Sequence, residues 1–180
     1  MNILALSGSL RAASINSALL RAAARLAPPG MTVTVFDGLA HLSLFNPDLD
    51  SDPPAAVAHF RSRVADADAL LIASPEYAHG ITGVMKNALD WLVSFEPFAH
   101  KPVAVLNASP RAHHADAALR EILRTMAAVI VEPASVTIPL VGAGLDEEGM
   151  ISSAAVTDQL RRMLAALHEA VASSACHGAD

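Results

Sequence analysis

Five short apolar runs recur along the chain, and segments with helical spacing of their apolar residues lie between and after them. This alternation limits the possible fold more than any other feature. The runs occupy residues 3–7, 32–36, 69–74, 103–108 and 128–138. Strands that lack polar alternation are typical of a parallel sheet covered on both faces. Parallel strands also require a crossover segment, usually a helix, between successive strands.

Helical patterns fill the intervals between the apolar runs. Apolar residues within 15–26, 119–126 and 156–171 follow the i, i+3, i+4, i+7 spacing of amphipathic helices. Strands that alternate with helices predict an α/β fold. We expect a flavodoxin-like three-layer sandwich, with a five-stranded parallel sheet in the order 2-1-3-4-5 and helices on both faces.

Three residues or pairs mark expected element boundaries. Asp52 before Pro53 predicts a helix cap followed by proline at the first helical position. Asp116 is expected to cap the fourth helix. Pro133 interrupts the last apolar run, which places that strand at an edge of the sheet.

Composition excludes several classes of protein. Over 180 residues, 53% are hydrophobic and 17% charged, which predicts one globular domain over 1–180 with a disordered polar tail from about residue 173. The net charge of -6, without a basic stripe, argues against nucleic acid as a partner. No window reaches the length of a membrane span, no signal peptide is evident, and the single cysteine, Cys176, has no intrachain partner. We therefore expect a cytoplasmic protein without membrane contact.

The loop SGSLRAASIN connects the first strand to the first helix. Sheets of this kind bind ligands at the carboxyl ends of their strands, and a helix N-terminus attracts phosphate. Ser9, Ser14 and Asn16 add neutral donors, and Arg11 can form a charged fork. Only one glycine stands where GxGxxG needs three, and no Gly-Lys-Ser/Thr occurs, so a single terminal phosphate suits this loop better than a magnesium triphosphate. The alternative is an ordinary turn in which Ser14 caps the helix.

The stretch SPEYAHGITGVMKNALDWL holds both the only tyrosine and the only tryptophan of the chain, Tyr77 and Trp91. Tyr77 follows a strand on the expected ligand edge, where its ring either packs against a planar heterocycle or covers the top of the core. Trp91 has helical spacing near an apolar face, which indicates the core or a subunit interface. Thr82 is expected to cap this helix.

GSLRAASIN followed by SPEYAHGITGVMKNALDW resembles the NADPH-dependent FMN reductase family, which includes quinone, chromate and azo-dye reductases of flavodoxin-like fold. The family pattern runs approximately G-S-L-R-x-x-S-x-N, then P-E-Y-N-x-x-x-P-G-x-L-K-N-A-I-D-W. The resemblance covers most of the chain, from the first strand through the fourth helix. The two motifs in this order and spacing are together highly specific.

The resemblance implies a set of binding residues and no catalytic side chain, because the flavin carries the chemistry. The FMN phosphate would be held by Ser9, Arg11, Ser14 and Asn16. The isoalloxazine ring would lie along Pro75, Glu76 and Tyr77, and backbone amides near these residues and Ser109 would stabilise negative charge on the reduced ring. Further family positions are matched by Lys86, Asn87, Asp90 and Trp91. These residues are expected to position the loop, or a partner subunit, and not to take part in the chemistry.

Three departures from the family pattern concern the same site. Ala78 replaces the asparagine after Glu-Tyr, and Thr82 replaces the proline before glycine. His113 and His114 stand near the place of an expected glycine pair. The two histidines are either solvated, or one of them points into the site and makes turnover depend on pH near neutrality. No spacing typical of a metal site occurs among the eight histidines.

These features predict an FMN-dependent NAD(P)H oxidoreductase with NADPH or NADH as donor. Its acceptor would be a small molecule, namely a quinone, an azo compound, a metal oxyanion or free flavin, reduced by a ping-pong mechanism. The resemblance also implies a homodimer or homotetramer. Two alternatives stay open: a non-enzymatic electron carrier of the flavodoxin type, and a flavin-free binding module of the same fold.

Overall fold

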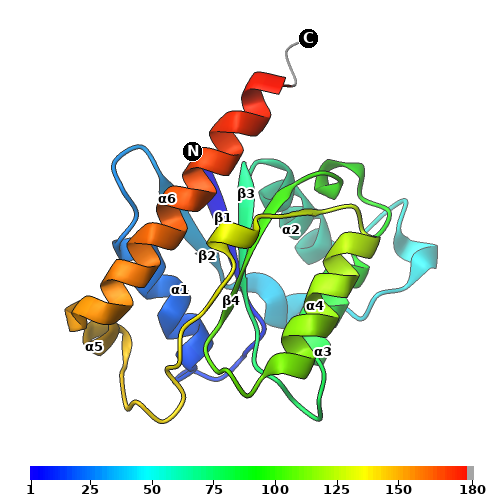
Figure 1. Ribbon diagram of the computed structural model, residues 1–180. Coiled ribbons are helices and arrows are strands. Elements are labelled where there is room, and N and C mark those ends of the chain that lie inside the picture. The colour runs from blue at the N-terminus through cyan, green and yellow to red at the C-terminus, as the bar shows by residue number, and fades with distance from the viewer. Residues whose placement is uncertain (178–180) are drawn as a thin grey trace.

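A parallel sheet in the order β2-β1-β3-β4-β5 separates two layers of helices (Figure 1). The computed structural model describes residues 1–177, and side chains through residue 173. The strands are β1 (Asn2–Ser7), β2 (Thr32–Phe36), β3 (Ala69–Ala73), β4 (Pro102–Asn107), β5 (Val129–Ile130) and β6 (Val136–Thr137). The predicted fold class and strand order are confirmed.

Six α-helices occur in the described part of the chain. They are α1 (Ile15–Arg25), α2 (Ala55–Ala65), α3 (Gly83–Asp90), α4 (His113–Thr125), α5 (Glu147–Ser152) and α6 (Ala154–His177). Helices α1 and α6 cover one face of the sheet, and α2, α3 and α4 cover the other (Figure 1). The short helix α5, which the sequence analysis did not predict, packs against α1 and α6.

The unbroken apolar runs follow from this double cover. Ile3 and Ala5 of β1 lie in the core beneath α1 and α6, whereas Leu4 and Leu6 lie in the core beneath α2, α3 and α4. Successive side chains of a strand point to opposite faces, so a central strand covered on both faces, such as β3, buries its residues on either side. Burial of apolar surface on both sides is the main force that holds the three layers together.

The last apolar run is broken in two at the sheet edge. Pro133 lies in a short 3₁₀ turn between β5 and β6, and both strands pair in parallel with β4. Ser135 spans the gap, because its hydroxyl accepts from the amide of Val105 at 3.0 Å and donates to the carbonyl of Val131 at 3.0 Å. The predicted edge position of this run is therefore confirmed, with a serine hydroxyl in place of one ladder bond.

Two predicted helix caps are wrong. Helix α2 begins at Ala55 after Pro54, so neither Asp52 nor Pro53 starts it. A residue that precedes proline is driven away from helical geometry, and Pro53 precedes Pro54.

Asp116 is likewise no cap, since α4 begins at His113 and Asp116 lies within its first turn. Its carboxylate accepts from the Nε of Arg120 at 2.8 Å instead. By contrast, the expected cap at Thr82 is confirmed, because its hydroxyl accepts from the amide of Met85 at 3.2 Å.

The C-terminal helix extends beyond the predicted limit of the ordered chain. Loss of order was expected from about residue 173, yet α6 continues to His177. The hydroxyl of Ser173 donates to the carbonyl of Glu169 at 2.8 Å, in keeping with helical geometry there. Residues 178–180 and the side chain of Cys176 lie outside the described part, so the expectations about them are not tested.

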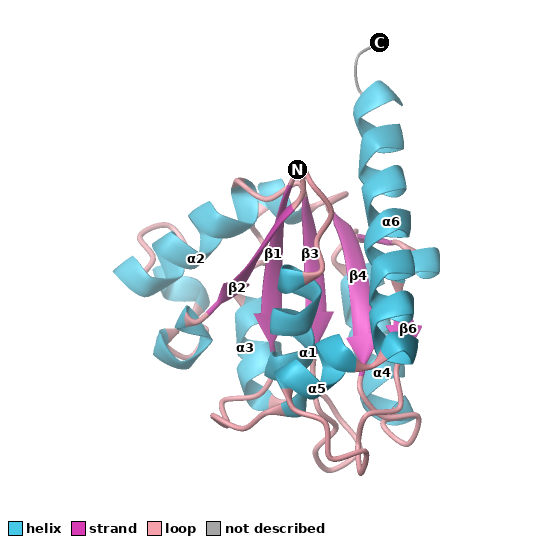
Figure 2. Ribbon diagram, turned by 90° about the vertical axis from the view of Figure 1, so that its left-hand side faces the viewer, coloured by secondary structure: helices cyan, strands magenta, loops and turns pink. Residues whose placement is uncertain are grey.

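Strands β1, β3 and β4 end at one edge of the sheet, where their loops gather (Figure 2). The loops that follow them, together with the first turn of α1, hold every residue predicted to bind a ligand. Among the helices of the described chain, none combines the length and the apolar character needed to cross a membrane.

Candidate functional site

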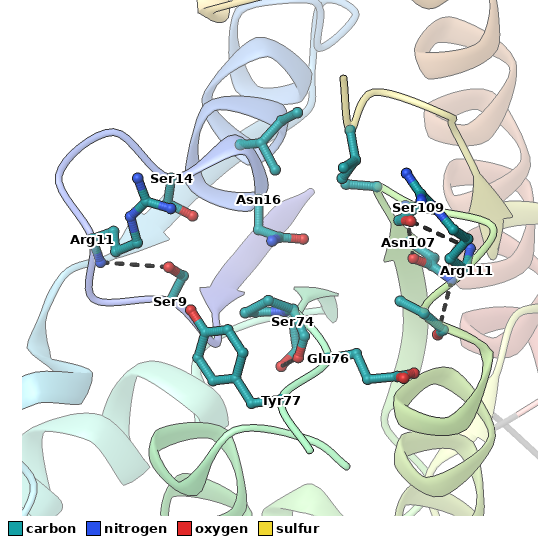
Figure 3. A pocket seen from close by; sticks show the side chains of 15 residues that line it. Ser9, Arg11, Ser14, Asn16, Ser74, Glu76, Tyr77, Asn107, Ser109 and Arg111 are labelled. Atoms are coloured by element: carbon teal, nitrogen blue, oxygen red, sulfur yellow. Dashed lines mark hydrogen bonds between the residues drawn. The ribbon is translucent and has the colours of Figure 1, made fainter. Parts of the chain in front are cut away.

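A pocket of about 360 Å³ opens between the loops that follow β1, β3 and β4. This volume lies within the range of small-molecule sites. All eight residues predicted to bind the cofactor line it, namely Ser9, Arg11, Ser14, Asn16, Pro75, Glu76, Tyr77 and Ser109. Figure 3 shows Arg11 and Ser14 on one side of the pocket, and Ser109 on the other. The fold therefore brings together three segments that lie far apart in the sequence.

Seven further lining residues were not predicted, and they are Ile15, Ser74, Asn107, Ala108, Arg111, Ala112 and Val141. Most carry a sequence signal that could have identified them, because they stand at the ends of β3 and β4 or at the beginning of the segments that follow. Val141 carries none, since it belongs to a loop after the broken edge strand. Its place depends on the turn of the chain beyond β6.

The β1–α1 loop approaches the end of β3 closely. The amide of Gly8 donates to the carbonyl of Ala73 at 2.8 Å, and a β-carbon at Gly8 would lie 2.3 Å from the Oγ of Ser74. Only glycine fits such a contact without a shift of the backbone. A contact of 2.7 Å between the hydroxyls of Ser7 and Ser17 ties the base of the loop to α1. The loop therefore has a fixed position relative to the helix end.

Helix α1 begins at the pocket. Ser14 is its N-cap, and its side chain accepts from the amide of Ser17 at 3.3 Å. The alternative prediction, that Ser14 caps the helix, is therefore confirmed. The amides of a first turn point out of the helix and leave a partial positive charge there. Capping by Ser14 and anion binding by the remaining first-turn amides are compatible.

Asn16 is the unusual residue of this helix end. Its side chain is 5% exposed, and its Oδ1 has no hydrogen-bond partner among the described residues. An unpaired polar atom without access to water costs free energy in the folded state. Asn16 faces the pocket (Figure 3). A ligand that donates to this oxygen would remove the penalty.

The loop after β3 is a tight hairpin turn. Tyr77 and Gly80 exchange two backbone hydrogen bonds, at 3.1 Å and 3.0 Å. The two residues between them are left-handed, with φ of 50° at Ala78 and 59° at His79. Such a turn favours Asn-Gly, and an alanine or histidine in this conformation is strained. The family's asparagine at position 78 thus has a backbone reason, which Ala78 lacks.

Replacement of Ala78 by asparagine is expected to raise the free energy of unfolding by about 0.5–1 kcal/mol, because asparagine tolerates the left-handed region. Ala78→Val should lower it, since a β-branched residue is disfavoured there. Urea unfolding of the two variants and the wild type measures the difference. Equal stability of the two variants would show that the turn is not strained at this position.

Glu76 connects the turn to α4. Its Oε2 accepts from the amide of Ala115 at 2.9 Å, which supplies the cap that Asp116 does not. The Ala115 amide holds the pKa of the Glu76 carboxyl below its ordinary value, and the charges of His114 and His79 act in the same direction. Glu76 therefore fixes two loops of the pocket relative to each other.

The lowered pKa predicts a pH-dependent contribution of Glu76 to stability. A carboxyl whose folded pKa lies below its unfolded pKa stabilises the fold above the unfolded value, and this contribution is lost as the pH falls through the folded value. Glu76→Gln keeps an acceptor for Ala115 but does not titrate. The gap in unfolding free energy between wild type and Glu76→Gln should stay constant from about pH 6 to pH 7 and shrink below about pH 4. Glu121→Gln, on an exposed position of α4, is the control and should show no such trend.

The loop after β4 is held by its own side chains. The Oδ1 of Asn107 accepts from the amide of Ser109 at 2.9 Å, and its Nδ2 donates to the carbonyl of Ala112 at 3.3 Å. The hydroxyl of Ser109 accepts from the amide of Arg111 at 3.3 Å. The Ser109 amide is thus engaged within the loop, as is the Tyr77 amide within its turn. These two amides therefore already have partners within the protein, and the expectation that amides near these residues stabilise a reduced ring stays a prediction.

The histidine pair lies outside the pocket lining. His113 and His114 are the first two residues of α4, and both side chains are exposed. His114 stacks against His79 with ring centroids 4.4 Å apart. This placement agrees with the interpretation of solvated residues and not with a histidine that points into the site. No group of three or more metal-binding side chains with suitable geometry occurs among the described residues.

The motif on α3 serves packing. Trp91 is fully buried, its Nε1 donates to the carbonyl of Ser43 at 2.8 Å, and its ring meets that of Phe45 edge to face. Asn87 accepts from the amide of Phe45 at 2.8 Å and donates to the same Ser43 carbonyl at 3.0 Å. Of the two interpretations of Trp91, the core is the one that the structure supports.

Comparisons with known proteins agree with this site. The family model described as NADPH-dependent FMN reductase matches residues 1–143. An NAD(P)H-dependent FMN reductase of Pseudomonas aeruginosa is 45% identical over 112 residues, which are 61% of this chain and 60% of that protein. A 2-hydroxy-1,4-benzoquinone reductase of Burkholderia sp. is 46% identical over 84 residues, or 47% of this chain and 45% of that protein. The matched segments thus span about half to three fifths of these relatives.

A solved structure extends the likeness of fold over nearly the whole chain. The flavoenzyme NAD(P)H:(acceptor) oxidoreductase of Paracoccus denitrificans superposes with a TM-score of 0.78 and 22% identity, over 96% of this chain and 97% of that one. At this identity the likeness concerns the fold alone. The family model covers more than half of the chain and includes all eight predicted site residues. The chain belongs to the NADPH-dependent FMN reductase family.

Proposed function

We propose that the protein is an FMN-dependent NAD(P)H oxidoreductase. One pocket mouth would serve a nicotinamide donor and then a small-molecule acceptor in turn, which is a ping-pong sequence. The observation that carries the proposal is the buried, unpaired Oδ1 of Asn16 beside the N-terminus of α1, in one pocket with Arg11. An unpaired amide oxygen, a helix N-terminus and a guanidinium together supply the acceptor and the donors that a phosphorylated polyol chain requires.

The β1–α1 side of the pocket fits the phosphate end of FMN. First-turn amides of α1 and the Arg11 guanidinium would bind the phosphate oxygens, and the Ser9 hydroxyl lies beside them (Figure 3). A hydroxyl of the ribityl chain would donate to the Oδ1 of Asn16. Arg11 takes part in no ion pair among the described residues, so its charge is available to an anion.

The β3 side of the pocket fits a planar ring. Pro75 and Tyr77 belong to the lining on this side, and Figure 3 shows the Tyr77 hydroxyl directed toward the β1–α1 loop. Tyr77 is 55% exposed, and Val141 on the opposite loop is also exposed. Apolar groups at the rim of a polar pocket favour a flat ligand that is itself amphipathic. Glu76 would keep this wall in place through its contact with α4.

The cofactor would supply the hydride chemistry, for which the pocket offers no side chain of its own. The protein itself would bind the phosphate, hold the two ring-lining loops in fixed relative positions, and leave one side of the pocket open. Relatives named as FMN reductase and as benzoquinone reductase support a quinone or free flavin as acceptor. Azo compounds and metal oxyanions are further electron acceptors that we propose.

Assembly and location are part of the proposal. We expect a homodimer or homotetramer in the cytoplasm, with no nucleic-acid partner. Asn87 and Trp91 fix the segment around Ser43 to α3, and Leu44 in that segment is 84% exposed. Val93, two residues after Trp91, is exposed as well. Exposed apolar side chains on a fixed surface support a subunit contact there.

Steady-state kinetics test the reaction sequence. Initial rates of NADPH oxidation by the FMN-loaded protein, at several fixed concentrations of 1,4-naphthoquinone, should give parallel double-reciprocal lines. Intersecting lines would contradict the alternate use of one site. The electron-carrier alternative predicts a yellow protein that does not consume NADPH at all, and the binding-module alternative predicts a protein that takes up no FMN.

A further inference from the structure

The pocket contains a second positively charged side chain, Arg111, which takes no part in the proposed contacts with the cofactor. Its lining contains three charged side chains, Arg11, Arg111 and Glu76. Glu76 is engaged with the Ala115 amide. Arg11 and Arg111 lie on opposite sides of the pocket (Figure 3). FMN offers one phosphate, which Arg11 and the end of α1 would bind, so Arg111 has no anion to bind from the cofactor's phosphate.

The Arg111 guanidinium also lacks a charged partner among the described residues. It takes part in no ion pair among the described residues, although six other arginines do. Two carboxylates of neighbouring segments are engaged elsewhere, Glu76 with α4 and Asp116 with Arg120. Arg11 and Arg111 thus both bring an unpaired guanidinium to the pocket, in a chain whose net charge is -6. With two guanidinium groups and one carboxylate that is already engaged, the lining favours small anions.

The backbone of Arg111 is fixed, whereas its side chain is exposed. Asn107, which is itself buried, holds both ends of the Ser109–Ala112 segment, and the Ser109 hydroxyl accepts from the Arg111 amide. A cation on a fixed backbone binds an anion at a lower entropic cost than one on a mobile loop. The His113 ring contacts the Arg111 carbonyl, at 3.1 Å, and the His114 ring, at 4.1 Å between centroids, and neither contact involves the Arg111 guanidinium.

We propose that Arg111 is a specificity-determining residue that pairs with an anionic group on the molecule exchanging electrons at the pocket mouth. This inference rests on the proposed function. Two sources offer such a group: the 2′-phosphate of a nicotinamide dinucleotide, and an acidic substituent on a quinone acceptor. Either would bind the forked guanidinium in a bidentate manner, which a neutral analogue cannot do.

The test compares wild type with Arg111→Gln, Arg111→Lys and Arg161→Gln. Arg161 is exposed on α6, so Arg161→Gln removes the same charge at a position away from the pocket. Dissociation constants of NADP⁺ and NAD⁺ for the FMN-loaded protein are measured by calorimetry. The ratio of kcat/KM for naphthoquinone-2-sulfonate to that for 1,4-naphthoquinone is measured with saturating donor. FMN affinity is measured on each variant by titration.

The wild type should favour the anionic member of at least one pair. Arg111→Gln should reduce that preference by about 10- to 100-fold, as expected for one charged hydrogen-bonded pair. Arg111→Lys should retain part of it, Arg161→Gln all of it, and FMN affinity should stay within about twofold. A lost NADP⁺ preference identifies the donor as the source, and a lost sulfonate preference identifies the acceptor.

Three outcomes would overturn the inference. Unchanged preferences in Arg111→Gln, with FMN bound and NADPH consumed, would refute it while the proposed function stands. Loss of FMN itself in Arg111→Gln would make Arg111 a cofactor contact. A wild type that takes up no FMN would refute the proposed function, and this inference with it, before any variant is compared.

Discussion

Trp91→Ala is expected to lower the free energy of unfolding by about 3–5 kcal/mol, the largest stability loss that we predict. The Trp91 side chain is fully buried, packs against Phe45 at a centroid distance of 5.0 Å, and lies near the Arg61 guanidinium. Removal of the indole leaves a cavity and ends the contact with the Ser43 carbonyl. Urea or thermal unfolding measures the loss, and the protein is expected to fold poorly near 37 °C.

Trp91→Phe separates a packing role from a role in ligand binding. Phenylalanine keeps much of the volume and loses the indole N–H, while Asn87 still donates to the Ser43 carbonyl. We expect a loss of about 1–2 kcal/mol in stability and an unchanged affinity for FMN. A folded Trp91→Phe protein that no longer binds FMN would mean that the indole, and not only Tyr77, belongs to the ligand site.

Arg11→Ala is expected to weaken FMN binding by about 10- to 150-fold, which corresponds to the loss of one charged hydrogen bond at ~1.5–3 kcal/mol. Arg11 lines the pocket and has no ion pair among the described residues, so the substitution should leave the stability of the protein without FMN nearly unchanged. Fluorescence titration with FMN measures the affinity. Titration with riboflavin, which lacks the phosphate, is the matched control and should show little difference between Arg11→Ala and wild type.

Arg161→Ala controls for net charge, because it removes an exposed arginine on α6 away from the pocket. It should bind FMN as the wild type does. Full affinity of Arg11→Ala for FMN would remove Arg11 from the phosphate site. An equal loss of affinity for FMN and riboflavin would place Arg11 against another part of the flavin.

The architecture was predictable because its causes are local. Unbroken apolar runs require a sheet covered on both faces, and Pro133 excludes a central strand for the last run. The errors arose where a local signal competed with a neighbour. Asp52 and Pro53 read as a helix start, but Pro54 forces an extended backbone before α2. Asp116 read as a cap, but the acceptor that caps α4 comes from Glu76, 39 residues earlier in the chain.

The candidate site was predictable where a motif names the residue, as at Ser9, Arg11 and Tyr77. Its electrostatics were not, because they depend on which groups already have partners. The Ser109 amide is engaged by Asn107, which the motif does not reveal. Arg111 stands out only when the ion pairs of the folded chain are known. The unpaired oxygen of Asn16 is likewise a property of the packed structure and not of the sequence.

The visible spectrum of the purified protein, titrated with FMN and then with NADPH under anaerobic conditions, tests the central claim most directly. The account predicts a stoichiometric, perturbed flavin spectrum whose visible absorption band bleaches when NADPH is added and returns with 1,4-naphthoquinone. A protein that stays colourless after incubation with FMN, or one whose bound flavin NADPH does not bleach, would contradict it.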